Sequence, residues 1–176
     1  MARSEKRDYL KEYLVYAPVA LALLRAIECR ELSAFRFQRP VLDLGCGDGL
    51  FGRVFFQDDA DVGLDHSMRE LHTAASRGAY RTLVRGDVGE LPFAAHSFAT
   101  VFSNGVLEHV EDLSQGLDEV TRVLRPGGRL IFTVPTMEDE LQLTGAALLR
   151  RLGLDSLAQA YAGFYNRVFA QINLHG

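Results

Sequence analysis

The sequence predicts an α/β fold in which one doubly wound, mostly parallel sheet carries helices on both faces. Three observations lead to this fold class. A short apolar strand at 41–44 runs into a glycine-rich loop and then into a helix, the unit from which such sheets are built. Strand-like and helix-like segments then alternate as far as residue 135. Turn signals separate them, including Gly78 and the Arg-Pro-Gly-Gly at 125–128.

The length and composition indicate a single globular domain of 176 residues, of which 48% are apolar and 24% are charged. The net charge of −4 argues against a broad nucleic-acid-binding surface. The longest apolar run, 17–24, is too short to span a bilayer, and no signal peptide is recognised, so we expect a cytoplasmic protein. Two cysteines and no Cys/His cluster predict neither a disulfide framework nor a metal site.

The first 39 residues are expected to form a helical segment that precedes the sheet. Apolar residues recur at helical spacing over 8–32, and Pro18 is expected to divide this run into two helices. Such a segment is a candidate lid over a ligand pocket, with Tyr13 and Tyr16 available to touch a substrate. Packing in the core is the alternative for both tyrosines.

The stretch Val-Leu-Asp-Leu-Gly-Cys-Gly-Asp-Gly at 41–49 predicts a site for a nucleotide-like ligand. Its three alternate glycines allow backbone conformations closed to other residues, and the loop N–H groups face whatever binds above the sheet. A dinucleotide-binding fingerprint would need a third glycine where Leu50 stands. Asp43, beside the loop, would repel a pyrophosphate and suits a ligand with a cationic end, such as the ammonium of a methionine moiety.

The segments that follow predict further strands ending at the same edge of the sheet. Residues 61–65 are expected to form a strand that ends in Asp65, twenty residues beyond Gly45, where nucleotide-binding folds place a carboxylate for ribose hydroxyls. Capping of the next helix is the alternative for Asp65, although Ser67 suits that role better. Further strands are expected at 80–84, 98–102 and 129–134, and further helices at 67–77 and 113–124.

Five ordered motifs between Pro40 and Pro135 resemble the class I S-adenosylmethionine-dependent methyltransferases of the type 11 group, which includes the ubiquinone and menaquinone biosynthesis enzymes. The resemblance implies a Rossmann-like sheet with strand order 3-2-1-4-5. It also implies S-adenosylmethionine as cofactor and S-adenosylhomocysteine as product. The motifs are the stretch 41–49, Gly-Leu-Asp-His-Ser at 63–67, Gly-Asp-Val-Gly-Glu-Leu-Pro-Phe at 86–93, the segment 97–110 and Arg-Val-Leu-Arg-Pro-Gly-Gly at 122–128.

By position, the resemblance also implies a cofactor site at the carboxyl ends of the strands. The methionine part would lie against the acid and the loop that follow the first strand. The ribose and adenine would lie against the ends of the second and third strands, and the sulfonium near the end of the fourth. The cofactor-binding residues implied in this way are Asp43, Gly45, Cys46, Gly47, Asp65, His66, Met68, Asp87, Val88 and Asn104.

The family usually completes its sheet with a sixth and a seventh strand, and we expect neither in this chain. The strand at 129–134 is too apolar to remain a bare edge, so association through the C-terminal third, as a homodimer, is expected. The single domain would then comprise a helical lid at 1–39, a cofactor-binding core at 40–135 and a helical cap at 136–176, with cap helices at 144–152 and 157–168.

Methyl transfer from a sulfonium is an in-line displacement, in which the protein aligns the acceptor and excludes water. A general base is needed only where the acceptor must lose a proton, and His109, beside Glu108, is the candidate. Capping of the next helix is the alternative for both residues. The sequence at 103–106 lacks the Asn/Asp-Pro-Pro-Tyr/Phe of amino-group methyltransferases on nucleobases and glutamine, so a small organic acceptor is expected rather than nucleic acid.

Two other functions remain open from the sequence. The chain could be a non-catalytic or truncated S-adenosylmethionine-binding protein that acts with a partner. A nicotinamide-dependent reductase would share the fold, but the chain has no Tyr-x-x-x-Lys and no third glycine at position 50.

Overall fold

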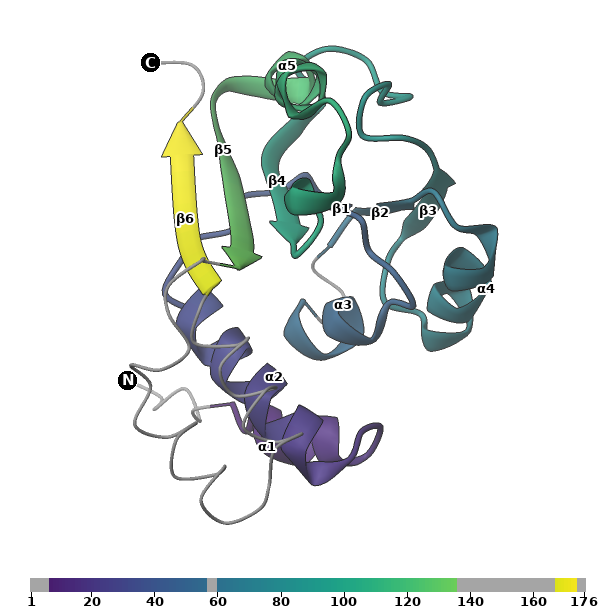
Figure 1. Ribbon diagram of the computed structural model, residues 1–176, viewed down its shortest axis with the longest axis vertical. Coiled ribbons are helices and arrows are strands. Elements are labelled where there is room, and N and C mark those ends of the chain that lie inside the picture. The colour runs from purple at the N-terminus through teal and green to yellow at the C-terminus, as the bar shows by residue number, and fades with distance from the viewer. Residues whose placement is uncertain (1–6, 57–59, 136–166, 174–176) are drawn as a thin grey trace.

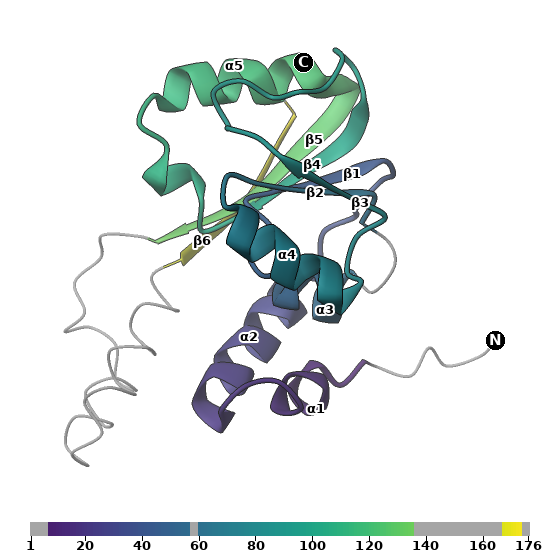
Figure 2. The ribbon, with the colours of Figure 1, turned by 90° about the vertical axis from the view of Figure 1, so that its right-hand side faces the viewer.

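The computed structural model describes residues 7–56, 60–135 and 167–173, which build a sheet between two layers of helices (Figures 1 and 2). The strand order is β3-β2-β1-β4-β5-β6. Neighbouring strands from β3 to β5 run parallel, so the predicted order 3-2-1-4-5 is confirmed. The strands are β1 (Val41–Leu44), β2 (Val62–Asp65), β3 (Thr82–Arg85), β4 (Phe98–Asn104), β5 (Leu124–Pro135) and β6 (Arg167–Asn173).

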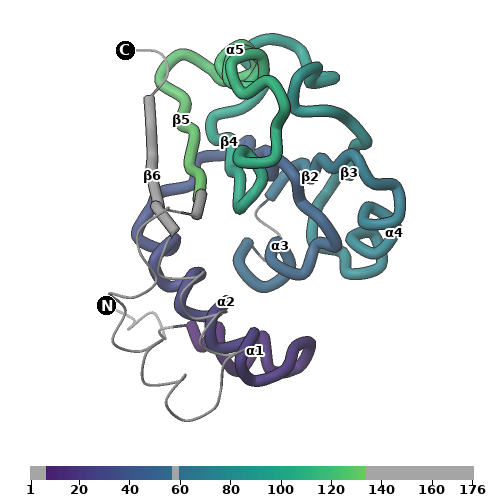
Figure 3. The backbone as a smooth tube through the Cα atoms, in the orientation of Figure 1, coloured from purple at the N-terminus to yellow at the C-terminus, as the bar shows by residue number. Residues whose placement is uncertain are grey.

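The helices lie on both faces of the sheet, as a doubly wound fold requires. Figure 2 shows α5 on one face and α1 to α4 on the other, and Figure 3 follows the chain through the crossovers from β1 to β3. The helices are α1 (Tyr9–Leu14), α2 (Val19–Leu32), α3 (Leu50–Phe55), α4 (Met68–Arg77) and α5 (Leu113–Val123), with a short 3-10 turn η1 (Leu107–His109) after β4.

Local sequence signals account for the ends of these helices. Pro18 separates α1 from α2 and stands at the N-cap of α2, where its missing N–H costs nothing. The side chains of Asp8 and Ser67 cap α1 and α4 by accepting hydrogen bonds from backbone N–H groups of the first turn. Gly78 ends α4 in the left-handed conformation with φ of 62°. These boundaries agree with the sequence-based predictions.

Two apolar layers flank the sheet because successive side chains of a strand point to opposite faces. Along β1, Val41 lies in the layer under α1 to α4, whereas Leu42 and Leu44 lie in the layer under α5. β1 is therefore buried on both faces, as its apolar sequence predicts. The layer under α1 to α4 is rich in stacked and edge-to-face aromatic rings, from Phe37, Phe51, Phe55, Phe56 and Phe102.

The strand β6 corrects the expectation that the sheet ends at β5. It pairs antiparallel with β5 over 129–135, and the two strands lie side by side in Figure 1. Val168, expected at the end of a helix, is instead paired with Val134. The expected helix at 144–152, and the part of the second cap helix before 167, lie outside the described residues.

Because β6 occupies the free edge of β5, the reason for expecting a dimer no longer holds. Backbone N–H and C=O groups along that edge are paired within the chain rather than offered to a second copy. Homodimerisation through the C-terminal third therefore stays a prediction, and the edge of β5 no longer supports it.

Candidate functional site

A cavity of about 580 Å³ opens at the carboxyl ends of β1 to β4. This is the edge at which the sequence predicts a ligand site, because parallel strands present their carboxyl ends together. The turn η1 and the start of α5 close the cavity on the side of β4. The lining residues are Gly45, Leu64, Asp65, His66, Gly86, Asp87, Val88, Gly89, Gly105, Val106, His109, Val110, Glu111, Asp112 and Gln115.

The glycine loop after β1 can pass the cavity only because it carries no side chain at Gly45. Gly45 has φ of 75°, and a Cβ at this position would overlap the side chain of Val106. The backbone N–H groups of Gly45 and Cys46 both donate to the carbonyl of Leu64 in β2, at 2.8 and 2.9 Å. The loop is therefore held against the end of β2.

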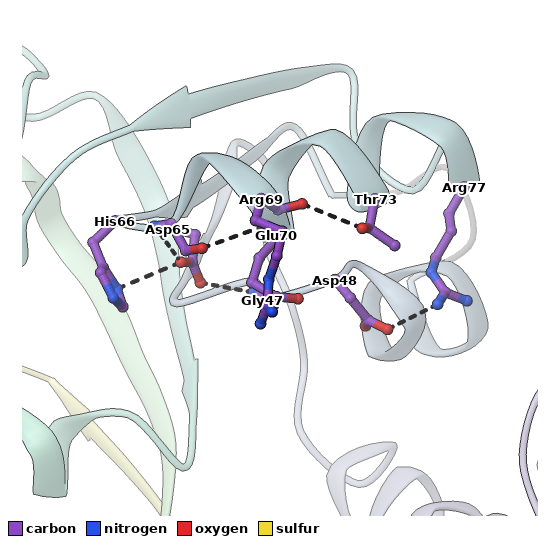
Figure 4. A network of polar contacts seen from close by, with 9 residues as sticks. Gly47, Asp48, Asp65, His66, Arg69, Glu70, Thr73 and Arg77 are labelled. Carbon is purple, nitrogen blue, oxygen red and sulfur yellow. Dashed lines mark hydrogen bonds and ion pairs between the residues drawn. The ribbon is translucent and has the colours of Figure 1, made fainter.

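Asp65 joins the end of β2 to the glycine loop, as Figure 4 shows. Its carboxylate is only 7% exposed and accepts backbone N–H groups of Gly47, at 2.9 Å, and Ser67, at 2.8 Å. One of these bonds reaches each oxygen, which leaves further lone pairs for a ligand. The Nδ1 of the exposed His66 lies 3.5 Å from Asp65 Oδ1. The side chain that caps α4 is that of Ser67, the residue that the sequence favours for this role.

A second link fastens the same loop to α4. The guanidinium of Arg77 donates to Asp48 Oδ2 at 2.8 Å (Figure 4). The other oxygen of Asp48 accepts the N–H of Leu50 at 2.9 Å. Two of the helices flanking the sheet, α3 and α4, are thereby tied to the loop between β1 and α3.

The loop after β3 is held by α5. Asp87 is exposed, and its Oδ1 accepts the N–H of Gly89 at 2.8 Å, while Gln115 donates to the carbonyl of Gly89 at 2.9 Å. Farther along, Arg122 donates to the carbonyls of Phe93 and Leu91 at 2.7 and 2.9 Å. These bonds position the wall of the cavity that carries Asp87.

Asp43 lies beneath the glycine loop rather than at the cavity wall. It is 3% exposed, and the hydroxyl of Tyr80 donates to its Oδ2 at 2.6 Å. Burial raises the pKa of the Asp43 carboxyl to about 7, against the lowering effect of the Tyr80 hydrogen bond. The nearby thiol of Cys46 is also buried, and this burial raises its pKa.

The structure brings together some of the implied site residues and leaves others outside the cavity. Gly45, Asp65, His66, Asp87 and Val88 line it, as does the base candidate His109. Asn104 instead accepts a hydrogen bond from Thr133 at 2.6 Å, and Met68 is 44% exposed at the start of α4. The implied cofactor residues that do not line the described cavity are Asp43, Cys46, Gly47, Met68 and Asn104.

The N-terminal helices do not form a lid in the described structure. They pack on the sheet face that carries α3, and none of their residues lines the cavity (Figure 2). Tyr13 is 1% exposed and meets the thiol of Cys29 at 3.9 Å, so burial removes it from contact with a substrate. Tyr16 is 52% exposed but lies outside the cavity lining. For Tyr13, core packing was the correct alternative.

Sequence reasoning assigned no site role to several residues that line the cavity, among them Val106 and Gln115. Val106 has no distinguishing local pattern, because its role depends on the loop that faces it from β1. Gln115 stands in the first turn of α5, and only the folded chain brings it to Gly89. Neither position could be assigned without the tertiary contact.

The charge of the cavity favours a cationic ligand. Four carboxylates line it, from Asp65, Asp87, Glu111 and Asp112, and the described lining contains neither Lys nor Arg. Such a wall attracts ammonium and sulfonium groups and repels phosphates.

Neither a metal-binding group nor a membrane-spanning helix is found within residues 7–56, 60–135 and 167–173. No group of three or more His, Cys, Asp or Glu side chains in these ranges could hold a metal ion. No helix in them is both long and apolar enough to cross a membrane.

Comparison with known proteins identifies relatives for the core of the chain. A family model described as a methyltransferase domain, of the type 11 group, matches residues 42–132. A similar curated protein is the malonyl-[acyl-carrier protein] O-methyltransferase of Pseudescherichia vulneris, with 39% identity over 99 residues. The match covers 54% of this chain and 39% of that relative, so the chain spans about two fifths of the relative's length.

Solved structures with the same fold include an S-adenosylmethionine-dependent methyltransferase from Mesorhizobium loti. It is 28% identical, with a TM-score of 0.55, over 64% of this chain and 54% of that one. A second is a possible histamine N-methyltransferase from Thermotoga maritima, with a TM-score of 0.61 over 93% of this chain and 74% of that one. At 20% identity, this second likeness shows the fold alone.

Proposed function

This chain belongs to the type 11 family of methyltransferase domains, and from that membership we propose that it transfers a methyl group from S-adenosylmethionine to a small organic acceptor. The observation that carries the proposal is the acidic cavity at the carboxyl ends of the parallel strands. Its wall offers negative charge to a ligand whose sulfonium and ammonium groups are positive.

The implied residues that line the cavity, among them Gly45, Asp65 and Asp87, support this cofactor. Asp65 is buried at the cavity wall, is fixed by Gly47 and Ser67, and keeps lone pairs for two ribose hydroxyls. Gly45 lines the cavity, and its lack of a side chain lets the loop pack against Val106. When bound, S-adenosylmethionine supplies an already activated methyl group.

The chain's own residues then bind, orient and desolvate the reactants. We assign the methionine end to Asp43 and the glycine loop, and the ribose to Asp65. His66 and Met68 are assigned to the adenine side. The remaining assignments are Asp87 as acceptor for the adenine amino group, Val88 as backbone donor to the ring and Asn104 near the sulfonium.

The acceptor that we propose to test first is the free carboxylate of a malonyl thioester. The support is the name of the curated relative, a malonyl-[acyl-carrier protein] O-methyltransferase. A carboxylate oxygen is ionised at neutral pH and needs no general base. Where the acceptor is instead a hydroxyl or an amine, His109 is the residue at the cavity wall that would take its proton.

Calorimetric titration tests the cofactor assignment directly. We expect S-adenosylhomocysteine to bind roughly tenfold or more tightly than NADH or ATP, because the carboxylates of the cavity repel phosphates. Tighter binding of NADH or ATP would contradict the proposal. Transfer of radiolabel from methyl-labelled S-adenosylmethionine to a panel of malonyl thioesters, hydroxy acids and amines then tests turnover.

The same two measurements separate the alternatives. A non-catalytic S-adenosylmethionine-binding protein that acts with a partner would bind S-adenosylhomocysteine but transfer no label. A nicotinamide-dependent reductase is not favoured, because the matched family is one of methyltransferases. Homodimerisation is measured separately by light scattering, since the acceptor panel does not depend on it.

A further inference from the structure

A slot formed by two glycines, Gly52 and Gly63, admits the ring of Tyr80 beneath the glycine loop. Tyr80 lies just before β3, and a Cβ on Gly63 in β2 would be 2.9 Å from its ring. A Cβ on Gly52 in α3 would overlap the Tyr80 hydroxyl. The chain therefore carries no side chain at these two positions, on α3 and β2, where the ring passes.

The slot places the Tyr80 hydroxyl within hydrogen-bond distance of Asp43. The hydroxyl donates to Asp43 Oδ2 at 2.6 Å, which is a short bond of the kind made to an ionised acceptor. The proton stays on the phenol, because burial and the adjacent carboxylate raise the pKa of Tyr80 well above its ordinary value. Tyr80 is thus a fixed donor to a buried acid.

We propose that Tyr80 is a positioning residue for cofactor binding, whose hydroxyl keeps the Asp43 carboxylate oriented and ionised for the α-ammonium of S-adenosylmethionine. The inference rests on the proposed function, because the role of Asp43 toward the ammonium belongs to it. Tyr80 itself acts only through Asp43 and does not line the cavity.

The surroundings explain why Asp43 needs such a donor. The titratable groups that face the pair are Asp65 at the end of β2 and Cys46 and Asp48 in the glycine loop. The negative charge of Asp65 opposes ionisation of Asp43, and burial opposes it more strongly. Among the groups acting on Asp43, the Tyr80 hydroxyl is the one that favours the charged form.

This arrangement couples cofactor affinity to pH near neutrality. Burial raises the pKa of Asp43 to about 7, so lowering the pH through 7 protonates the acid and removes its attraction for an ammonium. Removing the Tyr80 hydroxyl takes away a bond to the charged form, which raises the pKa of Asp43 further. The loss of affinity would then begin at a higher pH.

The test is calorimetric titration of S-adenosylhomocysteine from pH 6 to 8.5, comparing wild-type protein with Tyr80→Phe, which keeps the ring in the slot. At pH 7 we expect the variant to bind about fivefold more weakly, with the midpoint of the pH dependence raised by about one unit. Binding of 5′-methylthioadenosine, which lacks the ammonium, should be unchanged. In an Asp43→Asn background, Tyr80→Phe should add no further loss.

Each outcome has one meaning. Equal weakening of both ligands without a pH shift would assign Tyr80 a purely structural role and overturn the inference. Unchanged binding of S-adenosylhomocysteine by Tyr80→Phe would overturn it as well, while leaving the proposed function intact. No binding by the wild-type protein would overturn both. Thermal unfolding of each variant, with Tyr9→Phe as a matched control outside the slot, establishes that the fold persists.

Discussion

The carboxylate of Asp65 accepts the backbone N–H of Gly47 at 2.9 Å, which joins the end of β2 to the glycine loop that follows β1. The two residues are 18 positions apart in sequence. A single side chain thereby both faces the cavity and sets the position of the loop. Substitutions of Asp65 should consequently affect ligand binding in two ways, by lost ligand contacts and by a less ordered loop.

We expect Asp65→Ala to weaken binding of S-adenosylhomocysteine by roughly 2–4 kcal/mol, because two hydrogen bonds from ribose hydroxyls to a charged acceptor are lost. Calorimetric titration measures this directly. The matched control is Asp118→Ala, an exposed carboxylate on α5 outside the cavity lining. Unchanged affinity in Asp65→Ala would show that the ribose assignment is wrong.

Asp43 makes the stability of the protein depend on pH in an unusual direction. Burial raises its pKa from 3.8 in an unfolded chain to about 7, so the folded state binds the proton more tightly than the unfolded state does. The stabilisation by this proton is complete below pH 3.8 and is lost as the pH rises through 7. A charged Asp43 therefore destabilises the folded state at alkaline pH.

Replacing Asp43 with Asn should remove this destabilising effect. We compare the unfolding free energy of Asp43→Asn with that of the wild-type protein at pH 4 and at pH 8. The difference between them should change in favour of the variant by roughly 1–3 kcal/mol from pH 4 to pH 8. Chemical denaturation at the two pH values gives the difference, with Asp118→Asn as the exposed control. If the variant instead lost stability relative to wild type as the pH rose, the burial argument for Asp43 would fail.

Arg122 should matter for the cavity although it does not line it. Its guanidinium donates to the carbonyls of Leu91 and Phe93 and lies 2.6 Å from Glu119, whose carboxylate in turn accepts the N–H of Leu91. We expect Arg122→Ala to lower the unfolding free energy by about 1–2 kcal/mol, reduced from a fully buried value because the side chain is partly exposed.

Arg122→Lys should rescue little of this stability, since an ammonium cannot reproduce the planar set of donors. Chemical denaturation compares both variants with Arg69→Ala, whose side chain is 88% exposed. Full rescue by Lys would mean that charge alone, rather than the bonds to two carbonyls, holds the loop.

His109 is the residue for which activity and affinity should separate. If the acceptor identified in the panel is a hydroxyl or an amine, His109→Gln should lower kcat by roughly 100-fold or more while leaving the affinity for S-adenosylhomocysteine nearly unchanged. Glu108→Gln is the matched control, because Glu108 is adjacent and exposed but does not line the cavity. An equal effect of both substitutions would indicate helix capping rather than proton transfer.

Much of this protein is determined locally by its sequence. The apolar run at 41–44 with the glycines after it specifies a strand, a loop and a helix, because these depend on side-chain polarity and backbone freedom within a few residues. Asp8, Ser67 and Gly78 similarly set helix ends through bonds to the nearest turn. Asp65 could be placed at the ligand edge because parallel strands all end there.

Only the tertiary structure decided the features that depend on contacts between distant segments. The residues of β6 carry no decisive local signal, and their strand conformation is specified by pairing with β5. Tyr13 is a core residue because two helices fold it against Cys29 and the sheet. Tyr80 reaches Asp43 across 37 positions of sequence through space left by glycines on α3 and β2. Hydrogen bonds and packing of this kind form only when the sheet brings those elements together, so no local sequence pattern could predict them.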